Sequence, residues 1–254
     1  MLRAKERAAN DGLPPWVRHE HDERYRFASR FVDGADVVDV ACGDGTGTAT
    51  YAEAGARSIH AFDVSEAAVE STRQRQLASV HVAVADGRAL PLDDDSADVF
   101  ITLETIEHIP EAERFVEEIA RILRPGGVVV CSTPNRAVYS PGTPPDGKPW
   151  NPYHVKEFDL DELRESLGRK FVDLEYFGQN ATNRYVARTL AALGRVLPFN
   201  LAVRLRQAGK LRLLLRDSPA RHAVKPLDVD RPPEIFVIVA AKPGAAAEPR
   251  AATA

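Results

Sequence analysis

Two carboxylates and an imidazole stand close together in the segment "LETIEHIP", which covers residues 103–110 and overlaps the end of the apolar run "ADVFITL". Carboxylates and imidazoles bind divalent cations, and they also act as general acids and bases. One turn of α-helix would bring positions i, i+3 and i+4, here Glu104, Glu107 and His108, to one face. The segment is therefore a candidate metal site, a candidate acid/base site, or only the polar start of a helix.

A further candidate ligand lies downstream, where "NPYHVKEF" contains His154. This histidine follows the fifth predicted strand and could return to the same edge of a sheet. The candidate metal ligands are then Glu104, Glu107, His108 and His154, and two carboxylates with imidazole suit Mg²⁺, Mn²⁺ or Zn²⁺. In the reading without metal or acid/base chemistry, Glu104 touches a cofactor, Glu107 is solvated near a helix start and His108 packs there.

Glycines mark the place where the first predicted strand turns into the first helix. "VVDVACGDGTGT" contains Gly43, Gly45 and Gly47, and glycines at such a turn let a ligand approach the backbone near a helix N-terminus. The spacing differs from the G-x-G-x-x-G fingerprint of dinucleotide-binding proteins, which weakens a nicotinamide dehydrogenase reading. A tight strand-to-helix turn without a ligand is the alternative.

Two aspartates end the next two predicted strands. Asp63 ends "HAFD" about twenty residues beyond the glycines, where an acid can accept hydrogen bonds from ribose hydroxyls, and Asp86 follows "VAVA". In an open parallel sheet, ligands bind outside the carboxyl ends of the strands. Three successive strand ends therefore indicate one crevice for a nucleoside ligand.

Short apolar runs alternate with amphipathic segments from about residue 35 onward, and they predict the elements that position these side chains. The runs "DVVDVA", "SIHAFDVS", "VHVAVAD", "ADVFITL" and "VVVCSTP" are separated by segments with helical spacing. Repeated strand and helix is the pattern of a parallel sheet covered on both faces. A helix in "DLDELRESLGRKF" and strands in "FVDLEYFG" and "EIFVIVAAK" follow, and a helix in "HEHDERYRFASRFV" precedes the first strand.

These motifs, in this order and spacing, resemble the class I S-adenosylmethionine-dependent methyltransferases over about residues 36–134. The resemblance implies an α/β fold with a Rossmann-like seven-stranded sheet, helices on both faces and an antiparallel last strand, here "EIFVIVAAK". It implies S-adenosyl-L-methionine as cofactor, with Asp63 on the ribose hydroxyls and Asp86 with Gly87 on the adenine. The implied cofactor-binding residues are Tyr25, Asp39, Ala41, Gly43, Gly45, Asp63, Val64, Asp86, Gly87, Arg88 and Leu103.

The Glu-x-x-Glu-His cluster has its own resemblance. It is similar to the cluster of ubiquinone-biosynthesis O-methyltransferases and of small-RNA 3′-terminal 2′-O-methyltransferases, in which these residues bind a divalent cation. The resemblance implies Mg²⁺ or Mn²⁺ at Glu104, Glu107, His108 and His154, or His108 with Glu107 as the catalytic residues in a reaction without a cation. His108 is the catalytic candidate in both cases.

We predict a single methyltransferase domain in residues 1–242, with an N-terminal helical cap in residues 1–34. A basic helical insert in residues 179–233 precedes the last strand, and residues 243–254 form a disordered tail. The insert is a candidate contact with an anionic membrane or a phosphate-bearing substrate. In the Pro-rich loop before His154, Trp150 and Tyr153 are candidates for stacking on a sugar.

The composition is that of an ordinary globular protein. Of 254 residues, 44% are hydrophobic and 28% are charged, and the net charge of -4 gives no overall attraction to nucleic acid. Cys42 and Cys131 follow no metal or redox spacing, and no run of about eighteen apolar residues could span a bilayer, so we expect a cytoplasmic protein.

The function that these observations favour is O-methylation of a hydroxyl on a sugar, a glycosylated natural product or another small molecule. RNA 3′-terminal 2′-O-methylation is the second hypothesis, because the cluster and the basic insert favour it although the net charge does not. A non-catalytic S-adenosylmethionine-binding protein is the third hypothesis.

Overall fold

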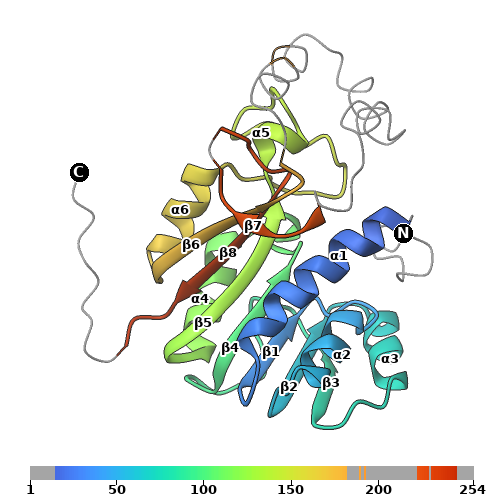
Figure 1. The fold of residues 1–254 in the computed structure, drawn as a ribbon. Helices are drawn as coiled ribbons and strands as arrows, with labels where there is room; N and C mark the ends of the chain where they lie inside the picture. Colours follow the sequence, from blue (N-terminus) through green and yellow to red (C-terminus); the bar gives the residue numbers. More distant parts are fainter. Residues whose placement is uncertain (1–14, 182–188, 190–191, 193–221, 229, 245–254) are drawn as a thin grey trace.

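The protein is built around one eight-stranded sheet, as the computed structural model in Figure 1 shows. The structure describes residues 15–181, 189, 192, 222–228 and 230–244. The strand order across the sheet is β3-β2-β1-β4-β5-β8-β6-β7. The strands are β1 (Asp36–Val40), β2 (Ser58–Asp63), β3 (Val80–Val84), β4 (Ala97–Leu103), β5 (Leu123–Pro134), β6 (Val172–Gln179), β7 (Lys225–Pro226) and β8 (Ile235–Ala241).

The strand directions confirm a Rossmann-like arrangement with an antiparallel last strand. The neighbouring strands from β3 to β5 pair in parallel, and β8 runs antiparallel to both β5 and β6. The chain moves outward from β1 to β3 and then returns to β4, so the strand order reverses between β1 and β4. Ligands bind at the carboxyl ends beside such a reversal.

The predicted number of seven strands was wrong, because β7 adds an eighth. This strand pairs antiparallel with β6 through only two residues, Lys225 and Pro226. Two residues are too short to show the alternation by which a strand is recognised in a sequence, and proline is tolerated only at the edge of a sheet. The segment lies inside the stretch that was predicted to be helical.

Helices cover both faces of the sheet, as predicted. In Figure 1, α1 (Pro15–Ala28), α2 (Thr46–Glu53) and α3 (Glu66–Gln74) lie on one face, and α4 (Ala112–Ile122) and α6 (Leu160–Gly168) lie on the other. The shorter helices are α5 (Arg136–Tyr139) and the 3₁₀ turns η3 (Ser29–Phe31) and η4 (Ile106–His108). Helix α6 begins at a capping box, in which Asp159 and Glu162 satisfy each other's backbone amides.

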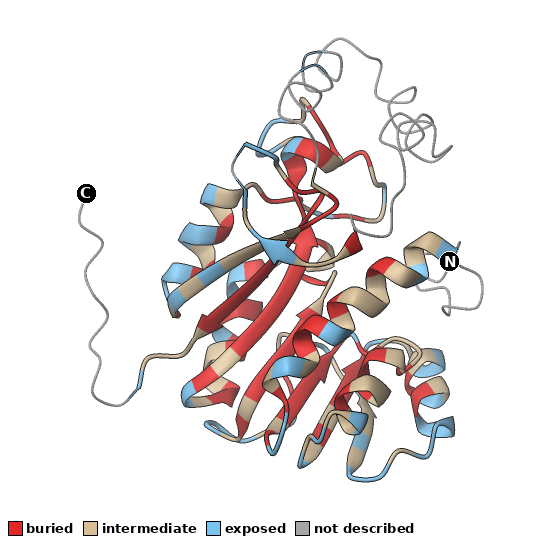
Figure 2. Cartoon of the chain, viewed as in Figure 1, coloured by how far each residue is buried: buried red, intermediate tan, exposed pale blue. Residues whose placement is uncertain are grey.

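The apolar core consists of two layers, one on each side of the sheet. Val37 of β1 packs with the residues of α1 and α2, whereas Val38 packs with those of α4. Alternation along a strand sends successive side chains to opposite faces, and both faces here are covered. Figure 2 shows the result, since the central strands are buried along most of their length.

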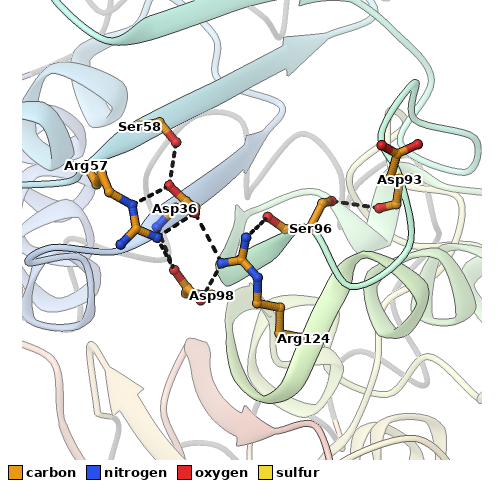
Figure 3. Close-up of polar contacts among 7 residues, drawn as sticks. All are labelled: Asp36, Arg57, Ser58, Asp93, Ser96, Asp98 and Arg124. Carbon is orange, nitrogen blue, oxygen red and sulfur yellow. Dashed lines mark hydrogen bonds and ion pairs between the residues drawn. The ribbon is translucent and has the colours of Figure 1, made fainter.

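Charged residues gather at the amino ends of the central strands, away from the carboxyl ends at which ligands bind in such sheets (Figure 3). Asp36 begins β1, Asp98 lies in β4, and Arg57 and Arg124 stand between their carboxylates. Arg57 Nη2 lies 3.0 Å from Asp98 Oδ2, and Arg124 Nη1 lies 3.1 Å from Asp36 Oδ2. We call these four residues the amino-end cluster. It joins β1 and β4 to β5 and to the segment before β2.

The flanking predictions are only partly within the described residues. Of the predicted cap in residues 1–34, residues 15–34 are described and contain α1 and η3. The predicted insert in residues 179–233 and the predicted tail in residues 243–254 lie mostly outside the described residues. Within the described part of the chain, no helix is long and apolar enough to cross a membrane.

Candidate active site

A cleft of about 760 Å³ lies at the carboxyl ends of the central strands. Its wall comes from helix α1, the turns after β1, β2 and β3, the segment after β4, and helix α5 with the loop before α6. It brings together nearly all the residues singled out in the sequence. The predicted site residues that line it are Tyr25, Asp39, Ala41, Gly43, Asp63, Val64, Asp86, Gly87, Arg88, Leu103, Glu104, Glu107, His108 and His154.

Gly45 is the predicted site residue that does not line the cleft. It stands at the N-terminus of α2 with a φ of 79°, and a β-carbon there would lie 2.8 Å from the side chain of Thr72. Gly43 also has a positive φ, of 58°, but the space around it differs, because a β-carbon there would meet no atom within 4 Å. Gly45 therefore allows α2 and α3 to pack closely, while Gly43 forms an open part of the wall.

Ala41 adopts a left-handed backbone conformation, with a φ of 63°. This conformation costs a residue with a β-carbon about 1 kcal/mol. The strained turn directs the chain from the end of β1 into the glycine segment and contributes to the cleft wall. Strain of this kind is often found at ligand-binding sites.

Two aspartates form the wall beside this turn. Asp63 accepts hydrogen bonds from the backbone amides of Gly43, at 3.1 Å, and Ser65, at 2.8 Å, so it holds the turn in place. Asp39 accepts a hydrogen bond of 2.6 Å from Thr48 Oγ1. Burial raises the pKa of Asp39, the Thr48 hydrogen bond opposes this shift and the negative charge of Asp63 adds to it, so that the pKa is about 7.

The third strand end contributes an ion pair. Arg88 Nη2 lies 2.7 Å from Asp86 Oδ2, and Arg88 Nη1 lies 2.6 Å from Glu111 Oε2. The hydrogen bonds from Arg88 lower the pKa of Asp86 to about 2. A β-carbon on Gly87 would lie 2.9 Å from the ring of Phe115, so the glycine lets this turn pack against α4.

Helix α1 covers the cleft with side chains that the sequence indicated only in part. Tyr25 was predicted, and a β-carbon on Gly47 would lie 2.9 Å from its ring, so that glycine makes room for it. His21 and Arg24 also line the cleft, and His21 was missed. Burial and the nearby Arg24 charge lower the pKa of His21 to about 3, so this imidazole is neutral. Its spacing from Tyr25, one helical turn, was the available signal.

The other end of the cleft contains a carboxylate and two imidazoles. One ligand atom each from Glu107, His108 and His154 lies within 4.8 Å of the others. Glu107 is 1% exposed, and its Oε2 accepts a hydrogen bond of 2.9 Å from Thr133 Oγ1. Its Oε1 has no hydrogen-bond partner within the described part of the chain. Burial raises the pKa of Glu107 well above its usual value, and the Glu104 charge adds to the effect.

Glu104 does not share a helical face with Glu107 and His108. A 3₁₀ turn covers only residues 106–108, and Glu104 lies before it with a φ of 54°. Its Oε1 accepts a hydrogen bond of 2.8 Å from Ser132 Oγ of β5. The helical spacing considered in the sequence is therefore not formed, because Glu104 is still held against the neighbouring strand where β4 ends.

Both histidines are oriented by contacts with the loop before α6. His108 Nδ1 lies 3.1 Å from the carbonyl oxygen of Tyr153, which can only accept, so Nδ1 carries the proton and Nε2 bears the lone pair. His154 Nδ1 lies 2.7 Å from Glu157 Oε1, and the His108 and His154 ring centroids are 4.9 Å apart. Sequence reasoning did not identify Glu157 as this partner, although its i+3 spacing from His154 was visible.

The two aromatic residues proposed for stacking have different positions. Tyr153 lines the cleft, whereas Trp150 is 5% exposed and is not among the residues that line it. Tyr139 of α5 also lines the cleft, and its ring stacks on His154 with centroids 5.5 Å apart. Tyr139 was missed, because its sequence neighbourhood carries no motif.

Comparisons with known proteins agree with this geometry. Residues 38–131 match the family model described as a methyltransferase domain. A protein of Mycobacterium tuberculosis named as a probable S-adenosylmethionine-dependent methyltransferase is 39% identical over 164 residues, which are 64% of this chain and 58% of that protein. The ubiquinone biosynthesis O-methyltransferase of Mesorhizobium japonicum is 28% identical over 158 residues, which are 56% of this chain and 61% of that protein.

The matched segment is thus similar to methyltransferase domains. The fold agrees, since a solved S-adenosylmethionine-dependent methyltransferase of Mesorhizobium loti superposes with a TM-score of 0.58 at 18% identity, covering 91% of this chain and 99% of that one. The first mycobacterial relatives are longer proteins, and the chain spans 57–58% of their length. The cofactor that these comparisons support is S-adenosylmethionine.

The cleft fits such a cofactor. The space beyond Gly43 is open, and the Asp63 carboxylate stands beside it. Two backbone amides use part of that carboxylate's accepting capacity, and a carboxylate has about four lone-pair sites. The remaining sites can accept hydrogen bonds from vicinal hydroxyls.

A divalent cation also fits the opposite end of the cleft. Among the described residues the buried Oε1 of Glu107 has no hydrogen-bond partner, and such an oxygen is costly unless a donor or a cation faces it. Glu107, His108 and His154 would hold the cation. Glu157 would accept the Nδ1 proton of His154, and the Nε2 of that ring, which lies 2.8 Å from Asn151 Nδ2, would exchange this contact for the cation.

Proposed function

We propose that this protein transfers a methyl group from S-adenosylmethionine to a hydroxyl oxygen of a sugar, a glycosylated natural product or another small molecule. The observation that carries the proposal is the pair of oriented imidazoles, His108 and His154, at the end of the cleft formed after β4 and before α6. An oxygen nucleophile needs a group that accepts its proton. A neutral amine is already nucleophilic and does not need such a group, so the two imidazoles favour an oxygen acceptor over an amine.

The proposed roles follow from the positions of the side chains. Asp63 binds the ribose hydroxyls, Asp86 with Gly87 and Arg88 lies beside the adenine, and Asp39 with Gly43 lies beside the methionine end. Tyr25, Ala41, Val64 and Leu103 complete the wall, and all of these residues line the cleft. Gly45 does not line the cleft; it leaves the space beside α2 that the Thr72 side chain of α3 occupies.

His108 is the proposed general base. Its Nδ1 proton is donated to the Tyr153 carbonyl, so its Nε2 is the nitrogen that can accept the proton of the acceptor hydroxyl. The oxygen–methyl bond forms while the sulfur–methyl bond breaks, and the sulfonium becomes a neutral thioether. Positioning the hydroxyl in line with the methyl group supplies much of the rate enhancement.

Glu107 assists in one of two forms. Its raised pKa favours the protonated carboxyl, which can donate a hydrogen bond to the acceptor from the unpartnered oxygen. With Mg²⁺ or Mn²⁺ bound, Glu107 would be ionised and would hold the cation with His108 and His154. The Nε2 of His108 would then be a metal ligand and not the base. A bound cation lowers the pKa of a coordinated hydroxyl and fixes its orientation.

RNA 3′-terminal 2′-O-methylation is the second candidate. The buried carboxylate with two imidazoles favours it, because a cation at such a site could bind the vicinal 2′ and 3′ hydroxyls of a terminal ribose. The basic segment between residues 184 and 225 is the proposed contact with phosphates, or with an anionic membrane surface or a phosphate-bearing small acceptor. We rank this candidate lower, because the net charge is -4.

The proposal is tested by incubating the protein with S-adenosylmethionine and a panel of acceptors. The panel contains sugars, glycosylated natural products, phenols, and RNA oligonucleotides with and without a 3′-terminal 2′-hydroxyl. We expect S-adenosylhomocysteine together with an acceptor that is one methyl group heavier by mass spectrometry. Each reaction is repeated with EDTA, and then with Mg²⁺ or Mn²⁺ added in excess.

The outcomes separate the candidates. Methylation of a small hydroxylated acceptor supports the leading proposal, and methylation only of RNA with a free terminal 2′-hydroxyl supports the second candidate. Binding of S-adenosylmethionine without turnover on any member of the panel would point to a non-catalytic binding protein. Activity that is unaffected by EDTA and by added cations would overturn the metal form of the mechanism.

A further inference from the structure

Arg24 of α1 has a buried guanidinium that forms no ion pair with a described residue. Its side chain lines the cleft, yet the residue is only 3% exposed. Among the described residues, no carboxylate lies within ion-pair distance of its guanidinium, and its side-chain partner is the neutral amide of Gln179. Burying an unpaired charge is costly, so such a group indicates an anionic ligand in the adjoining space.

The other positive groups on the described cleft wall do not have this property. Arg88 is compensated by the carboxylates of Asp86 and Glu111. His21, one turn before Arg24 on α1, is neutral at physiological pH. On the described part of the cleft wall, the Arg24 guanidinium is therefore the positive charge of α1 that no carboxylate pairs with.

Gln179 joins Arg24 to two other parts of the chain through one side chain. This residue ends β6 and is fully buried. Its amide oxygen accepts a hydrogen bond from Arg24 Nη1, and its amide nitrogen donates to the carbonyl oxygens of Glu20, at 2.9 Å, and His222. Both ends of the amide are thus used, which fixes its orientation and the position of the guanidinium.

The neighbouring residue strengthens the same junction. Asn180 Nδ2 donates to Glu20 Oε1 at 2.9 Å, and Asn180 Oδ1 lies 3.1 Å from His222 Nδ1. Asn180 and His222 flank residues 181–221 in the sequence. Helix α1 is therefore bound to the chain on both sides of that segment, and the position of Arg24 depends on this junction.

We propose that Gln179 is a positioning residue for cofactor binding: it holds the Arg24 guanidinium at the cleft wall, where Arg24 binds the carboxylate of the methionine part of S-adenosylmethionine. This inference rests on the proposed function. A planar guanidinium binds a carboxylate through two parallel hydrogen bonds, and that geometry requires the guanidinium to be held in one orientation. The neutral amide of Gln179 provides that orientation without neutralising the charge.

The test compares two ligands that differ in the carboxylate. S-adenosylhomocysteine carries the amino acid group, whereas 5′-methylthioadenosine has the same nucleoside and sulfur without it. Dissociation constants for both are measured by calorimetry with the full chain. The variants are Gln179→Met, which removes both hydrogen-bonding functions, and Gln179→Glu, which keeps an acceptor but adds a competing negative charge. Arg26→Met is the matched control, because Arg26 lies on the exposed side of the same helix.

We expect each Gln179 variant to bind S-adenosylhomocysteine about tenfold more weakly, and to bind 5′-methylthioadenosine within about twofold of the wild type. Arg26→Met should change neither constant. A general loss of structure would weaken both ligands equally, and this outcome, or no change for either ligand, overturns the role of Gln179. If Gln179→Met does not fold, Gln179→Glu decides the question alone, since its carboxylate can still face Arg24.

The same measurement distinguishes this inference from the proposed function. A wild-type protein that binds neither ligand would overturn both. A wild-type protein that binds both ligands, together with Gln179 variants that lose no selectivity for S-adenosylhomocysteine, would overturn only the role of Gln179.

Discussion

Strand β1 carries two aspartates three positions apart, and their carboxylates lie in opposite environments. At the amino end, hydrogen bonds from Arg57 lower the pKa of Asp36 below its usual value, and those from Ser58 and Arg124 add to the effect (Figure 3). Near the carboxyl end, burial raises the pKa of Asp39 to about 7. The same residue type therefore stabilises the fold at one end of the strand and is destabilising, when ionised, at the other.

The difference extends across the sheet. The acids of the amino-end cluster, Asp36 and Asp98, both face arginines. Glu107 at the carboxyl end is buried with an unpartnered oxygen and a raised pKa. Incompletely compensated charge of this kind is typical of ligand and catalytic sites, because a bound ligand supplies the missing partner. The compensated charges at the amino end stabilise the fold, and the uncompensated ones at the carboxyl end support the binding and chemistry proposed there.

The largest expected effect is at the carboxyl end, on activity. Substitution His108→Gln keeps a polar side chain but removes the proton-accepting nitrogen. We expect turnover of the identified acceptor to fall by about 10²–10⁴-fold, with a free energy of unfolding within about 0.5 kcal/mol of the wild type. Initial rates and urea unfolding measure the two quantities. Full activity in the variant would exclude His108 as the base.

The next effect is at the amino end, on stability. In Asp36→Asn, Arg57 and Arg124 each lose a charged partner, and we expect the free energy of unfolding at pH 7.5 to fall by about 1–2 kcal/mol. Turnover per folded molecule should not change. Because the folded-state pKa of Asp36 is lowered, its contribution is present above pH 4 and is lost as the pH falls through that pKa. Urea titrations across this range test the sign, and an equal loss at every pH contradicts it.

The smallest expected effect is the opposite pH dependence at Asp39. The folded protein binds a proton at Asp39 between about pH 4 and pH 7 that the unfolded chain does not bind, so the contribution of Asp39 to stability falls as the pH rises through 7. We therefore compare the change in the free energy of unfolding that Asp39→Asn causes at two pH values. This change should be more stabilising at pH 8 than at pH 5, by about 1 kcal/mol. The same variant should bind S-adenosylhomocysteine more weakly. If Asp39→Asn and Asp36→Asn showed the same pH dependence, the contrast between the strand ends would be wrong.

Local patterns were sufficient for most of the fold and for the cofactor side of the cleft. The sequence patterns predicted β1 to β6 and β8. The central strands were the clearest, because strands buried on both faces must be continuously apolar. Asp63 and Asp86 were found because each stands at a strand end, and parallel strand ends meet at one edge. The two-residue strand β7 was not found, because it is too short to form a pattern.

The acceptor side could be predicted only as a set of candidates. The spacing of Glu104 suggested a shared helical face, but the chain remains extended there and Ser132 holds the carboxylate. Trp150 was a candidate for stacking and is buried. Whether a side chain faces the cleft depends on the loop that carries it, and loop conformation has no periodic signal in a sequence.

The sequence by itself determined the succession of strands and helices along the chain, the glycine turn and the acids at the strand ends. Each of these depends on neighbours within a few positions. Only the tertiary structure decided which charges are compensated. Asp36 and Asp39 look alike in the sequence. The pKa of Asp36 is lowered mainly by Arg57, 21 positions away, and also by Arg124, 88 positions away, whereas burial raises the pKa of Asp39. The contact between Arg24 and Gln179 spans 155 positions, and such distant pairs are brought together by the packing of the whole chain.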